Sequence, residues 1–311
     1  MAFRLARITL FAFRTPSLHP IPDPPMTPTA RSVAAALLLI GGTGLAAPHA
    51  PAQQTQSGPL QQAQQLDRDG DFARSRAIYQ AILDTITDAR AKANVQRRLA
   101  MSFGFEGDCA KAIEHEEMVI AYWKTREAEE PQNAFYQQGE MANEAARVCI
   151  DSDALDQAER MYRRGAELGN LEPEPRTHPR SLWTYRTEHA LARLAARRGN
   201  AAEAQRYVAA ARAALDGDPK MAEDQERYFP YLTGYVALYT GDLATAEAEL
   251  TKAVSMNQTD PFMNTLLAMT YEKQGKVDEA KALYAKAYDM ARAHNPPAAF
   301  ARRFLRQKLG M

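Results

Sequence analysis

Several features that mark other classes of protein are missing from the 311-residue sequence. No run of 18 or more apolar residues occurs, so we expect no stable insertion into a membrane once any leader is removed. The formal net charge is 0, which argues against nucleic acid as a partner. No HExxH, GxSxG, Walker A or strand-linked GxGxxG motif is present, so the sequence predicts no enzyme, no metal site and no cofactor.

Glycine, cysteine and strand-like patterns are also scarce. The chain has 16 glycines and only two cysteines, and its aromatic residues make up 8% of the total. Alternation of apolar and polar residues, which is typical of half-buried strands, does not occur. From residue 60 onward, by contrast, apolar residues recur at helical spacings of three and four. The sequence therefore predicts an all-α fold.

The first 52 residues differ in composition from the rest. Residues 1–25 contain a proline cluster and no regular period, and we interpret them as an extension upstream of a true start at Met26. Residues 26–52 have the parts of a secretory signal peptide: Arg31, a short apolar stretch, and small residues up to Ala52. The alternative is an amphipathic or buried helix at residues 33–47. Cleavage near Ala52 would leave 34 basic and 37 acidic residues, a net charge of −3. The predicted location is the bacterial periplasm or the exterior.

A period of 34 residues relates two segments near the C-terminal end. Each segment has a glycine that would end one helix, and small residues that would let a second helix pack closely against the first. The positions that match at this spacing are Gly241 and Gly275, Ala246 and Ala280, Leu250 and Tyr284, and Ala253 and Ala287. This pattern resembles the tetratricopeptide repeat (TPR) superfamily, in the form of a bacterial secreted or periplasmic TPR protein.

The resemblance extends over several more repeats, from residue 60 to about residue 290. Turns between paired helices are predicted at Gly70, Gly107, Asp153, Gly199, Gly241 and Gly275. An aspartate can serve as the third turn because it tolerates left-handed geometry better than most residues. The resemblance implies a right-handed α-solenoid of about six TPR-like helix-turn-helix repeats in residues 60–294. Residues 53–59 would form a linker before it, and residues 295–311 a C-terminal capping helix.

The second repeat departs most from the family pattern, because Glu116 stands where a large apolar residue is expected. Its second helix begins near Cys109, and Cys149 lies near the end of the first helix of the third repeat. Those two helices are antiparallel neighbours in TPR arrays, so the resemblance implies that the cysteines lie close together. In an oxidising compartment we predict a disulfide between them, with a stabilisation of roughly 3–4 kcal/mol in the chain-entropy model. The alternative is two buried, unpaired thiols.

In the TPR family, an inward stripe on the first helix of each repeat lines a concave surface that binds peptides. Helical spacing places a basic stripe on the fourth repeat and a tyrosine stripe on the fifth. The predicted peptide-binding groove residues are Arg98, Asn143, Arg147, Arg186, His189, Arg193, Arg197, Tyr228, Tyr231, Tyr235, Tyr239, Met269 and Lys273. Such bands suit a carboxylate-bearing or acidic extended segment with an aromatic or apolar anchor. The alternative is that the arginines are solvated and the tyrosines pack between helices.

The predicted function is a non-catalytic protein-protein interaction scaffold that presents this groove to an extended peptide or to a helix of a partner protein. The C-terminal helix, with Phe300 and Phe304 on one face and arginines on the other, is a second candidate contact. Two alternatives remain open. One is an enzyme, or an accessory domain, in cell-envelope (peptidoglycan or carbohydrate) processing, which would need a pair of carboxylates facing a cleft. The other is a self-assembling structural array.

Overall fold

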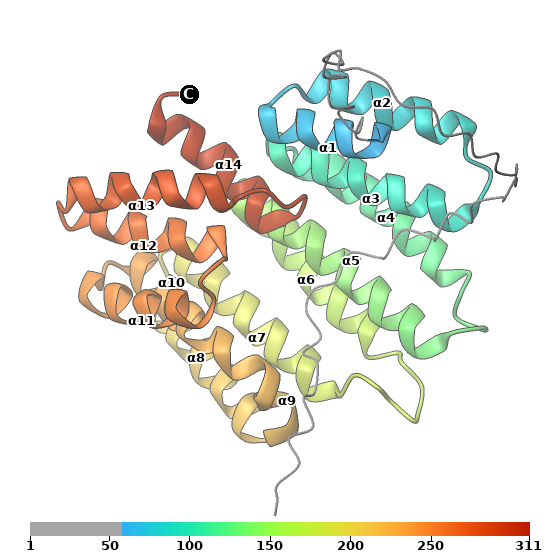
Figure 1. Cartoon of the computed structure of the whole chain (residues 1–311). Coiled ribbons are helices and arrows are strands. Elements are labelled where there is room, and N and C mark those ends of the chain that lie inside the picture. Colours follow the sequence, from blue (N-terminus) through green and yellow to red (C-terminus); the bar gives the residue numbers. More distant parts are fainter. Residues whose placement is uncertain (1–57) are drawn as a thin grey trace, which may run out of the picture. The chain divides into compact units, whose positions relative to one another are not determined.

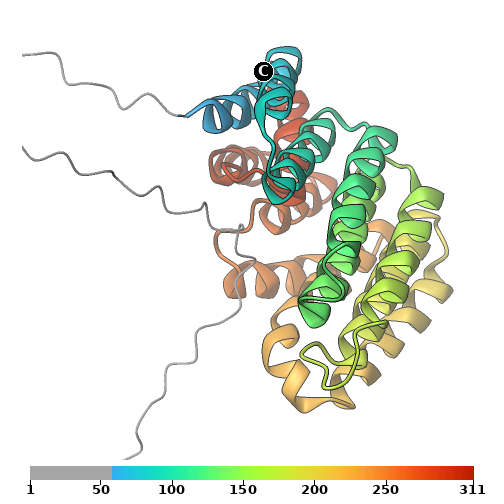
Figure 2. The same cartoon turned by 90° about the vertical axis from the view of Figure 1, so that its right-hand side faces the viewer.

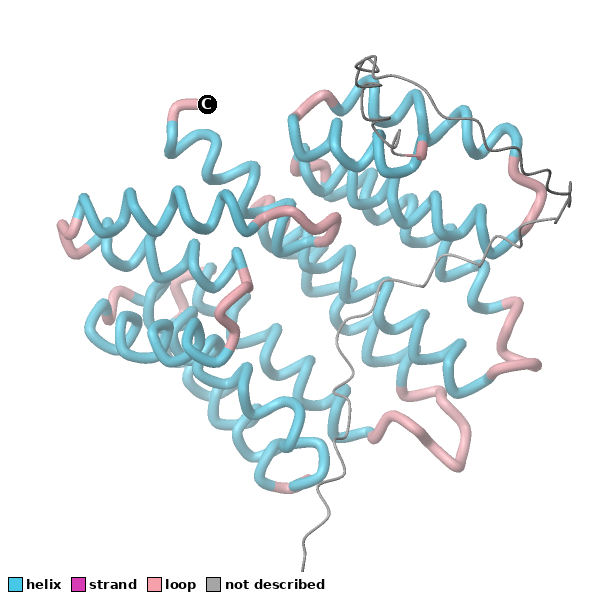
Figure 3. Tube along the Cα trace, in the orientation of Figure 1, coloured by secondary structure: helices cyan, strands magenta, loops and turns pink. Residues whose placement is uncertain are grey.

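The computed structural model describes residues 58–311, and every regular element in this range is a helix (Figure 1, Figure 3). An all-α fold is therefore confirmed for the described part of the chain. No helix within it is long and apolar enough to cross a membrane. The predicted extension 1–25, the predicted signal peptide 26–52 and most of the predicted linker 53–59 lie outside the described residues.

Most of the helices form hairpins, in which two helices are joined by a short turn. The first three hairpins are α1 (Pro59–Asp69) with α2 (Phe72–Thr85), α3 (Ala89–Glu106) with α4 (Cys109–Lys124), and α5 (Pro131–Asp151) with α6 (Leu155–Gly169). The next three are α7 (Arg180–Arg197) with α8 (Ala201–Asp216), α10 (Phe229–Thr240) with α11 (Leu243–Met256), and α12 (Pro261–Lys273) with α13 (Val277–Met290). The short helices α9 (Pro219–Gln225) and η1 (Glu226–Tyr228) separate the fourth and fifth hairpins, and α14 (Pro296–Leu309) comes last.

The turn inside each hairpin contains one residue with left-handed backbone geometry. The φ angle is positive at Gly70, Gly107, Asp153, Gly199, Gly241 and Gly275. These are the six turn positions predicted from the sequence. Within residues 58–311, Asp153 is the only residue other than glycine with a positive φ, at 60°. An aspartate often begins the second helix, as at Asp242, whose carboxylate accepts a hydrogen bond from the main-chain nitrogen of Thr245 at 3.1 Å.

Small residues let the two helices of a hairpin pack closely. The positions identified by the 34-residue period are buried on both second helices: Ala246, Leu250 and Ala253 on α11, and Ala280, Tyr284 and Ala287 on α13. Prolines mark the starts of several helices. They stand in the first turn, where no main-chain hydrogen bond is lost. Pro230 is one of them and marks the start of α10 instead of kinking a longer helix.

The C-terminal helix α14 lies between the N-terminal and the C-terminal hairpins (Figure 1, Figure 2). It packs against α12 and α13, as a cap of the last hairpin would, and also against α3 and α5. Phe300 of α14 meets Phe262 of α12 with ring centroids 4.8 Å apart. Leu305, one turn further on, belongs to a buried cluster that includes Met101 and Phe105 of α3. Helix α14 therefore joins hairpins that are distant in sequence.

Candidate binding site

The arginine stripe of α7 and the tyrosine stripe of α10 face each other and form hydrogen bonds. The guanidinium of Arg193 donates to the hydroxyl of Tyr231 at 3.1 Å and to the hydroxyl of Tyr162 at 3.0 Å. The guanidinium of Arg197 donates to the hydroxyl of Tyr235 at 3.1 Å and lies 4.8 Å from the ring centre of Tyr239. The structure therefore brings the two predicted stripes together, but the side chains of one stripe are the hydrogen-bond partners of the side chains of the other.

Several of these side chains are too deeply buried to touch a peptide on the surface. Arg193 is 6% exposed, and His189, Tyr231 and Tyr235 are buried with it. Burial and the nearby charges of Arg193 and Arg147 hold the pKa of His189 well below its ordinary value, so this imidazole is neutral. The arrangement agrees with the alternative drawn from the sequence for the tyrosines, which pack between helices.

The other predicted groove residues are less buried. Arg98, Asn143, Arg147, Tyr228, Tyr239 and Met269 are half-buried, and Lys273 is exposed. Arg186 is ion-paired with Glu140 of α5 and lies over the ring of Trp183 at 5.1 Å. The guanidinium of Arg147 forms no hydrogen bond and no ion pair within residues 58–311. Only some of the predicted groove residues are therefore accessible to a ligand.

A cavity of about 350 Å³ opens where α14 crosses the ends of α5, α7 and α10. Its size falls at the lower end of the range seen for small-ligand sites. One group of lining residues is polar and the other is apolar or aromatic. The polar group consists of Asp151, Ser152, Asp153, Arg197, Arg303 and Gln307, and the other consists of Tyr239, Met269, Phe300 and Phe304.

Charged groups of both signs line the polar side of this cavity. Arg197 is ion-paired with Asp153, whose side chain is 80% exposed. Burial raises the pKa of Asp151 to about 6, although the surrounding arginines, among them Arg197 and Arg303, act in the opposite direction. Burial lowers the pKa of Arg303 and the charge of Arg197 lowers it further, while Asp151 and Asp153 oppose the change. Two guanidinium groups are therefore held close together in the wall of one cavity.

Arginines on α14 contact the C-terminal ends of first helices. Arg303 donates to the main-chain oxygen of Asp151 at the end of α5, and Arg306 donates to the main-chain oxygen of Arg68 at the end of α1 at 2.5 Å. The negative end of a helix dipole favours such cations. A Cβ atom at Gly107 would overlap the guanidinium of Arg303. A side chain at that turn would therefore have to displace the guanidinium of Arg303, in addition to straining the left-handed backbone.

A buried polar cluster fixes the segment before α14 to the first hairpin. The Nε2 atom of His294 lies 2.8 Å from a carboxylate oxygen of Asp67, and the hydroxyl of Ser102 donates to the other oxygen at 2.6 Å. Tyr79 of α2 also donates to Asp67, at 3.2 Å. Burial lowers the pKa of His294, although Asp67 opposes the shift. This cluster connects residues that are more than 200 positions apart in the sequence.

The two cysteines are joined. Cys109 at the start of α4 and Cys149 near the end of α5 form a disulfide, with their Cα atoms 4.7 Å apart. Both side chains are buried in the core between the second and third hairpins. The predicted pairing is therefore confirmed, and the described residues contain no free cysteine.

The unexpected Glu116 of the second hairpin is completely buried. Neither of its carboxyl oxygens has a hydrogen-bond partner within residues 58–311. Burial raises its pKa well above the ordinary value, and the nearby charge of Glu144 adds to this, while Arg97 opposes it. Arg97 itself bonds Glu144 at 2.7 Å. Although two carboxyl groups lie near each other here, burial keeps Glu116 from any substrate.

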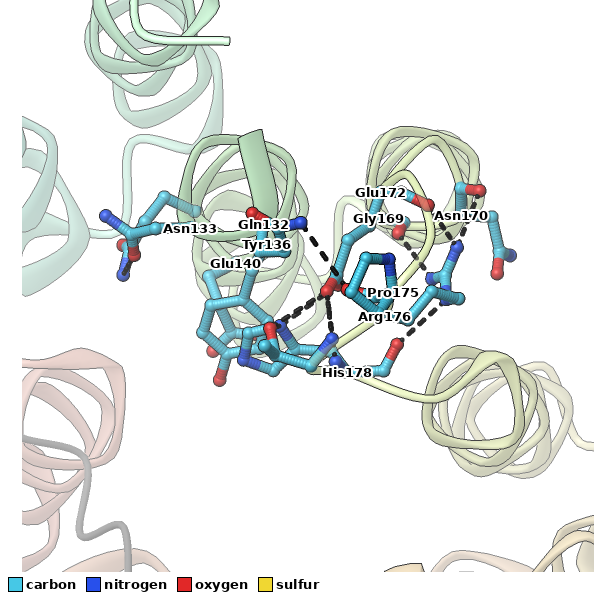
Figure 4. Close-up of polar contacts among 12 residues, drawn as sticks. Gln132, Asn133, Tyr136, Glu140, Gly169, Asn170, Glu172, Pro175, Arg176 and His178 are labelled. Carbon is cyan, nitrogen blue, oxygen red and sulfur yellow. Dashed lines mark hydrogen bonds and ion pairs between the residues drawn. The ribbon is translucent and has the colours of Figure 1, made fainter. Parts of the chain in front are cut away.

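The loop between α6 and α7 is held by a second set of polar contacts (Figure 4). The guanidinium of Arg176 donates to main-chain oxygens at the end of α6 and within the loop, including that of Glu172 at 2.7 Å. His178 stacks on Tyr136 of α5 with ring centroids 3.8 Å apart, and its Nδ1 lies 3.0 Å from Glu172. Burial would raise the pKa of Glu172, but hydrogen bonds from Thr177 and His178 lower it. These contacts fix the loop against α5.

Sequence reasoning missed part of the cavity wall. Asp151 carried no visible signal, because it stands at the end of a helix like many solvated aspartates. Asp153 was visible only as the one turn position that lacks glycine. The sequence predicts a candidate contact with Phe300 and Phe304 on one face and arginines on the other. The structure instead places Arg303 with both phenylalanines in the lining of one cavity, which Arg197 shares. Within residues 58–311, no group of three His, Cys, Asp or Glu side chains is arranged to hold a metal ion.

No protein-family model matches the chain, and no curated protein matches it. The function must therefore be argued from the hairpins, the cavity and their chemistry.

Proposed function

We propose that the protein is a non-catalytic, TPR-like α-solenoid that binds a polypeptide segment of another protein. The observation that carries this proposal is the way in which other helices of the chain bind α14. Three first helices, α3, α5 and α12, hold this helix through aromatic contacts and through arginines placed on helix ends. A face that accepts a helix of its own chain has the chemistry to accept a segment of another chain.

The contact surface in this proposal is the cavity and the side chains beside it. Helix α14 already covers part of the face, and the arginine–tyrosine contacts bury another part. What remains accessible is the cavity of about 350 Å³ with its rim, which includes the exposed side chain of Gln307. A volume of this size accommodates one anchor side chain or chain end, while the rest of the segment would lie along the surface.

The proposed location is the periplasm or the exterior of a bacterium. The buried disulfide supports an oxidising compartment, because such bonds are rare in the cytosol. The proposed cleavage after Ala52 is tested by the mass of the protein recovered from the cell envelope. An intact mass that still includes residues 26–52 would contradict cleavage.

Site-specific photo-crosslinking tests the binding function. A photoreactive amino acid replaces Gln307 at the cavity rim in one variant, and in the control it replaces Gln205, an exposed glutamine of α8. We expect a protein to be crosslinked reproducibly from position 307 and not from position 205, in cells illuminated under native conditions. The same products from both positions, or none from position 307, would contradict a partner site at the cavity.

A second candidate function is acid–base chemistry in cell-envelope processing, and Asp151 is the observation that favours it. This carboxyl group lines the cavity with a pKa of about 6, and a second carboxylate, Asp153, lies in the same wall. Conversion of a peptidoglycan or polysaccharide fragment by the parent protein, lost in Asp151→Asn, would support this function. Retained conversion in that variant would exclude Asp151 as its acid or base.

A further inference from the structure

The lining of the cavity specifies a kind of ligand. Arg197 of α7 and Arg303 of α14 come from distant parts of the sequence and both contribute to the polar wall. Each guanidinium has five N–H donors, and the contacts described above use only some of them. Like charges repel each other when water is excluded, so two cations in one wall favour the arrival of an anion.

More positive charge lies behind this wall. Arg193 is buried, and its hydrogen bonds go only to a main-chain oxygen and to phenol hydroxyls. Arg147 lies one turn before Asp151 on α5, and its guanidinium has no hydrogen bond or ion pair in the described part of the chain. Both arginines act on Asp151 electrostatically, as do Arg197 and Arg303. The charges of four arginines thus act on Asp151, and Asp153 is the other acid in the lining of the cavity.

The remaining lining residues are apolar and aromatic. Phe300 and Phe304 stack with ring centroids 5.5 Å apart at 13°. Met269 of α12 and the ring of Tyr239 complete the apolar part of the lining. Such a wall favours an aromatic or aliphatic group, which would gain contact area and lose water there.

We propose that this cavity binds a carboxylate that carries an adjacent aromatic or aliphatic group. The carboxylate accepts hydrogen bonds from Arg197 and Arg303, and the apolar group lies against Phe300, Phe304 and Met269. Two sources share this chemistry: the C-terminal residue of a polypeptide, and a free organic acid of similar size. The polypeptide source rests on the proposed binding function and narrows its ligand.

Asp153 occupies part of this anion site in the structure. Its exposed carboxylate is ion-paired with Arg197, and an arriving carboxylate would take over that contact. The substitution Asp153→Asn removes the competing charge and keeps a residue that tolerates the left-handed backbone. We expect this variant to bind the ligand several-fold more tightly than the parent protein does.

The test uses titration calorimetry of the full chain with four probes. They are N-acetyl-phenylalanine, its amide, a five-residue peptide that ends in phenylalanine, and the amide of that peptide. We expect each free acid to bind at least tenfold more tightly than its amide, because only the acid offers the arginines a negative charge. Binding of the acids should also weaken with rising salt.

Charge variants at the rim of the cavity distinguish binding at this site from non-specific electrostatic attraction to the protein. Gln307 is exposed and lines the cavity, so Gln307→Glu and Gln307→Lys change its charge without removing a buried contact. At a separation of several ångströms in a wet environment, one charge changes the affinity by about threefold. We expect weaker binding of the acids with glutamate and tighter binding with lysine. The matched pair Gln205→Glu and Gln205→Lys should have no effect.

The outcomes distinguish this proposal from the proposed function. Equal binding of acid and amide, or binding of the acid that ignores the charge at position 307, would overturn the carboxylate site even if a partner is crosslinked there. Binding of N-acetyl-phenylalanine with the expected charge dependence, without any crosslinked partner, would support the site with a free organic acid as ligand. The peptide-binding function would then be the part that fails.

Discussion

The substitution Glu116→Met should make the protein more stable, although it changes a completely buried residue. Both carboxyl oxygens of Glu116 lack a hydrogen-bond partner in the described residues. A buried polar group without a partner costs about 1–3 kcal/mol. Methionine has a similar length and no such cost, and the corresponding position of other hairpins holds Leu250 or Tyr284. The ion pair between Arg97 and Glu144 stays intact. We therefore expect the free energy of unfolding to rise by about 1–3 kcal/mol below about pH 4.5, where Glu116 is protonated in the folded and the unfolded chain alike.

The gain should also grow with pH. Burial raises the pKa of Glu116 above its ordinary value of 4.5, so the folded protein keeps a proton that the unfolded chain releases. The parent protein therefore has its full stability below about pH 4.5 and loses up to about 1.4 kcal/mol per pH unit above it, until the pH passes the raised pKa. The methionine variant lacks this loss. The difference between the two proteins isolates Glu116, because other titrating groups are common to both.

Urea unfolding followed by circular dichroism at pH 5, 6.5 and 8 measures this difference. The control is Glu114→Met, which replaces an exposed glutamate two residues earlier and should change stability by no more than about 0.5 kcal/mol. A less stable Glu116→Met variant would refute the reasoning. So would a difference that does not increase with pH, because it would mean that Glu116 is ionised in the folded protein.

Two further predictions concern the joints between hairpins. Replacing Cys109 and Cys149 together by alanine should lower the free energy of unfolding, measured by urea unfolding, by about 4 kcal/mol in the chain-entropy model. A reductant should lower the stability of the parent protein and leave that of the variant unchanged. An unfolding midpoint of the variant equal to that of the parent protein would contradict the model. Gly107→Ala should lower the thermal midpoint more than Gly241→Ala. Both glycines have φ near 90°, which costs an alanine about 1–2 kcal/mol, but only the Cβ at position 107 meets Arg303. Equal losses would mean that Arg303 moves aside freely.

The hairpins could be predicted from the sequence because their determinants are local. A left-handed turn needs glycine or a tolerant residue such as Asp153, and a close helix pair needs small residues at fixed distances from that turn. Ala280 and Ala287 meet this need within a single repeat, so a period of 34 residues is enough to identify them. The disulfide between Cys109 and Cys149 is one step less local, since it follows only once neighbouring hairpins are stacked.

The site could be predicted only in part, because its determinants are distant. Helical spacing identifies Arg193 and Arg197 as one stripe and Tyr231 and Tyr235 as another, which is correct. It does not say whether a stripe faces solvent or a second stripe. Burial of Arg193 follows from the approach of α10 to α7, and the cavity beside Arg197 exists only because α14 returns to the N-terminal hairpins. No local pattern encodes that return.

The surroundings of the six turn residues differ according to the position of α14. At Gly70 and Gly107 a side chain would have to displace the guanidinium of Arg306 or Arg303, in addition to straining the backbone. At Gly199, Gly241 and Gly275 nothing lies within 4 Å of the position of a Cβ atom, so only the backbone requires glycine there.

Asp153 stands between these two groups, at the edge of the cavity. Its backbone tolerates a side chain, and that side chain reaches Arg197 instead of colliding with α14. The turns of the first two hairpins are therefore covered by α14, whereas nothing lies within 4 Å of the Cβ position of the glycine in each of the last three turns. A binding partner that extends beyond the cavity would follow these open turns, because the arginines of α14 already occupy the others.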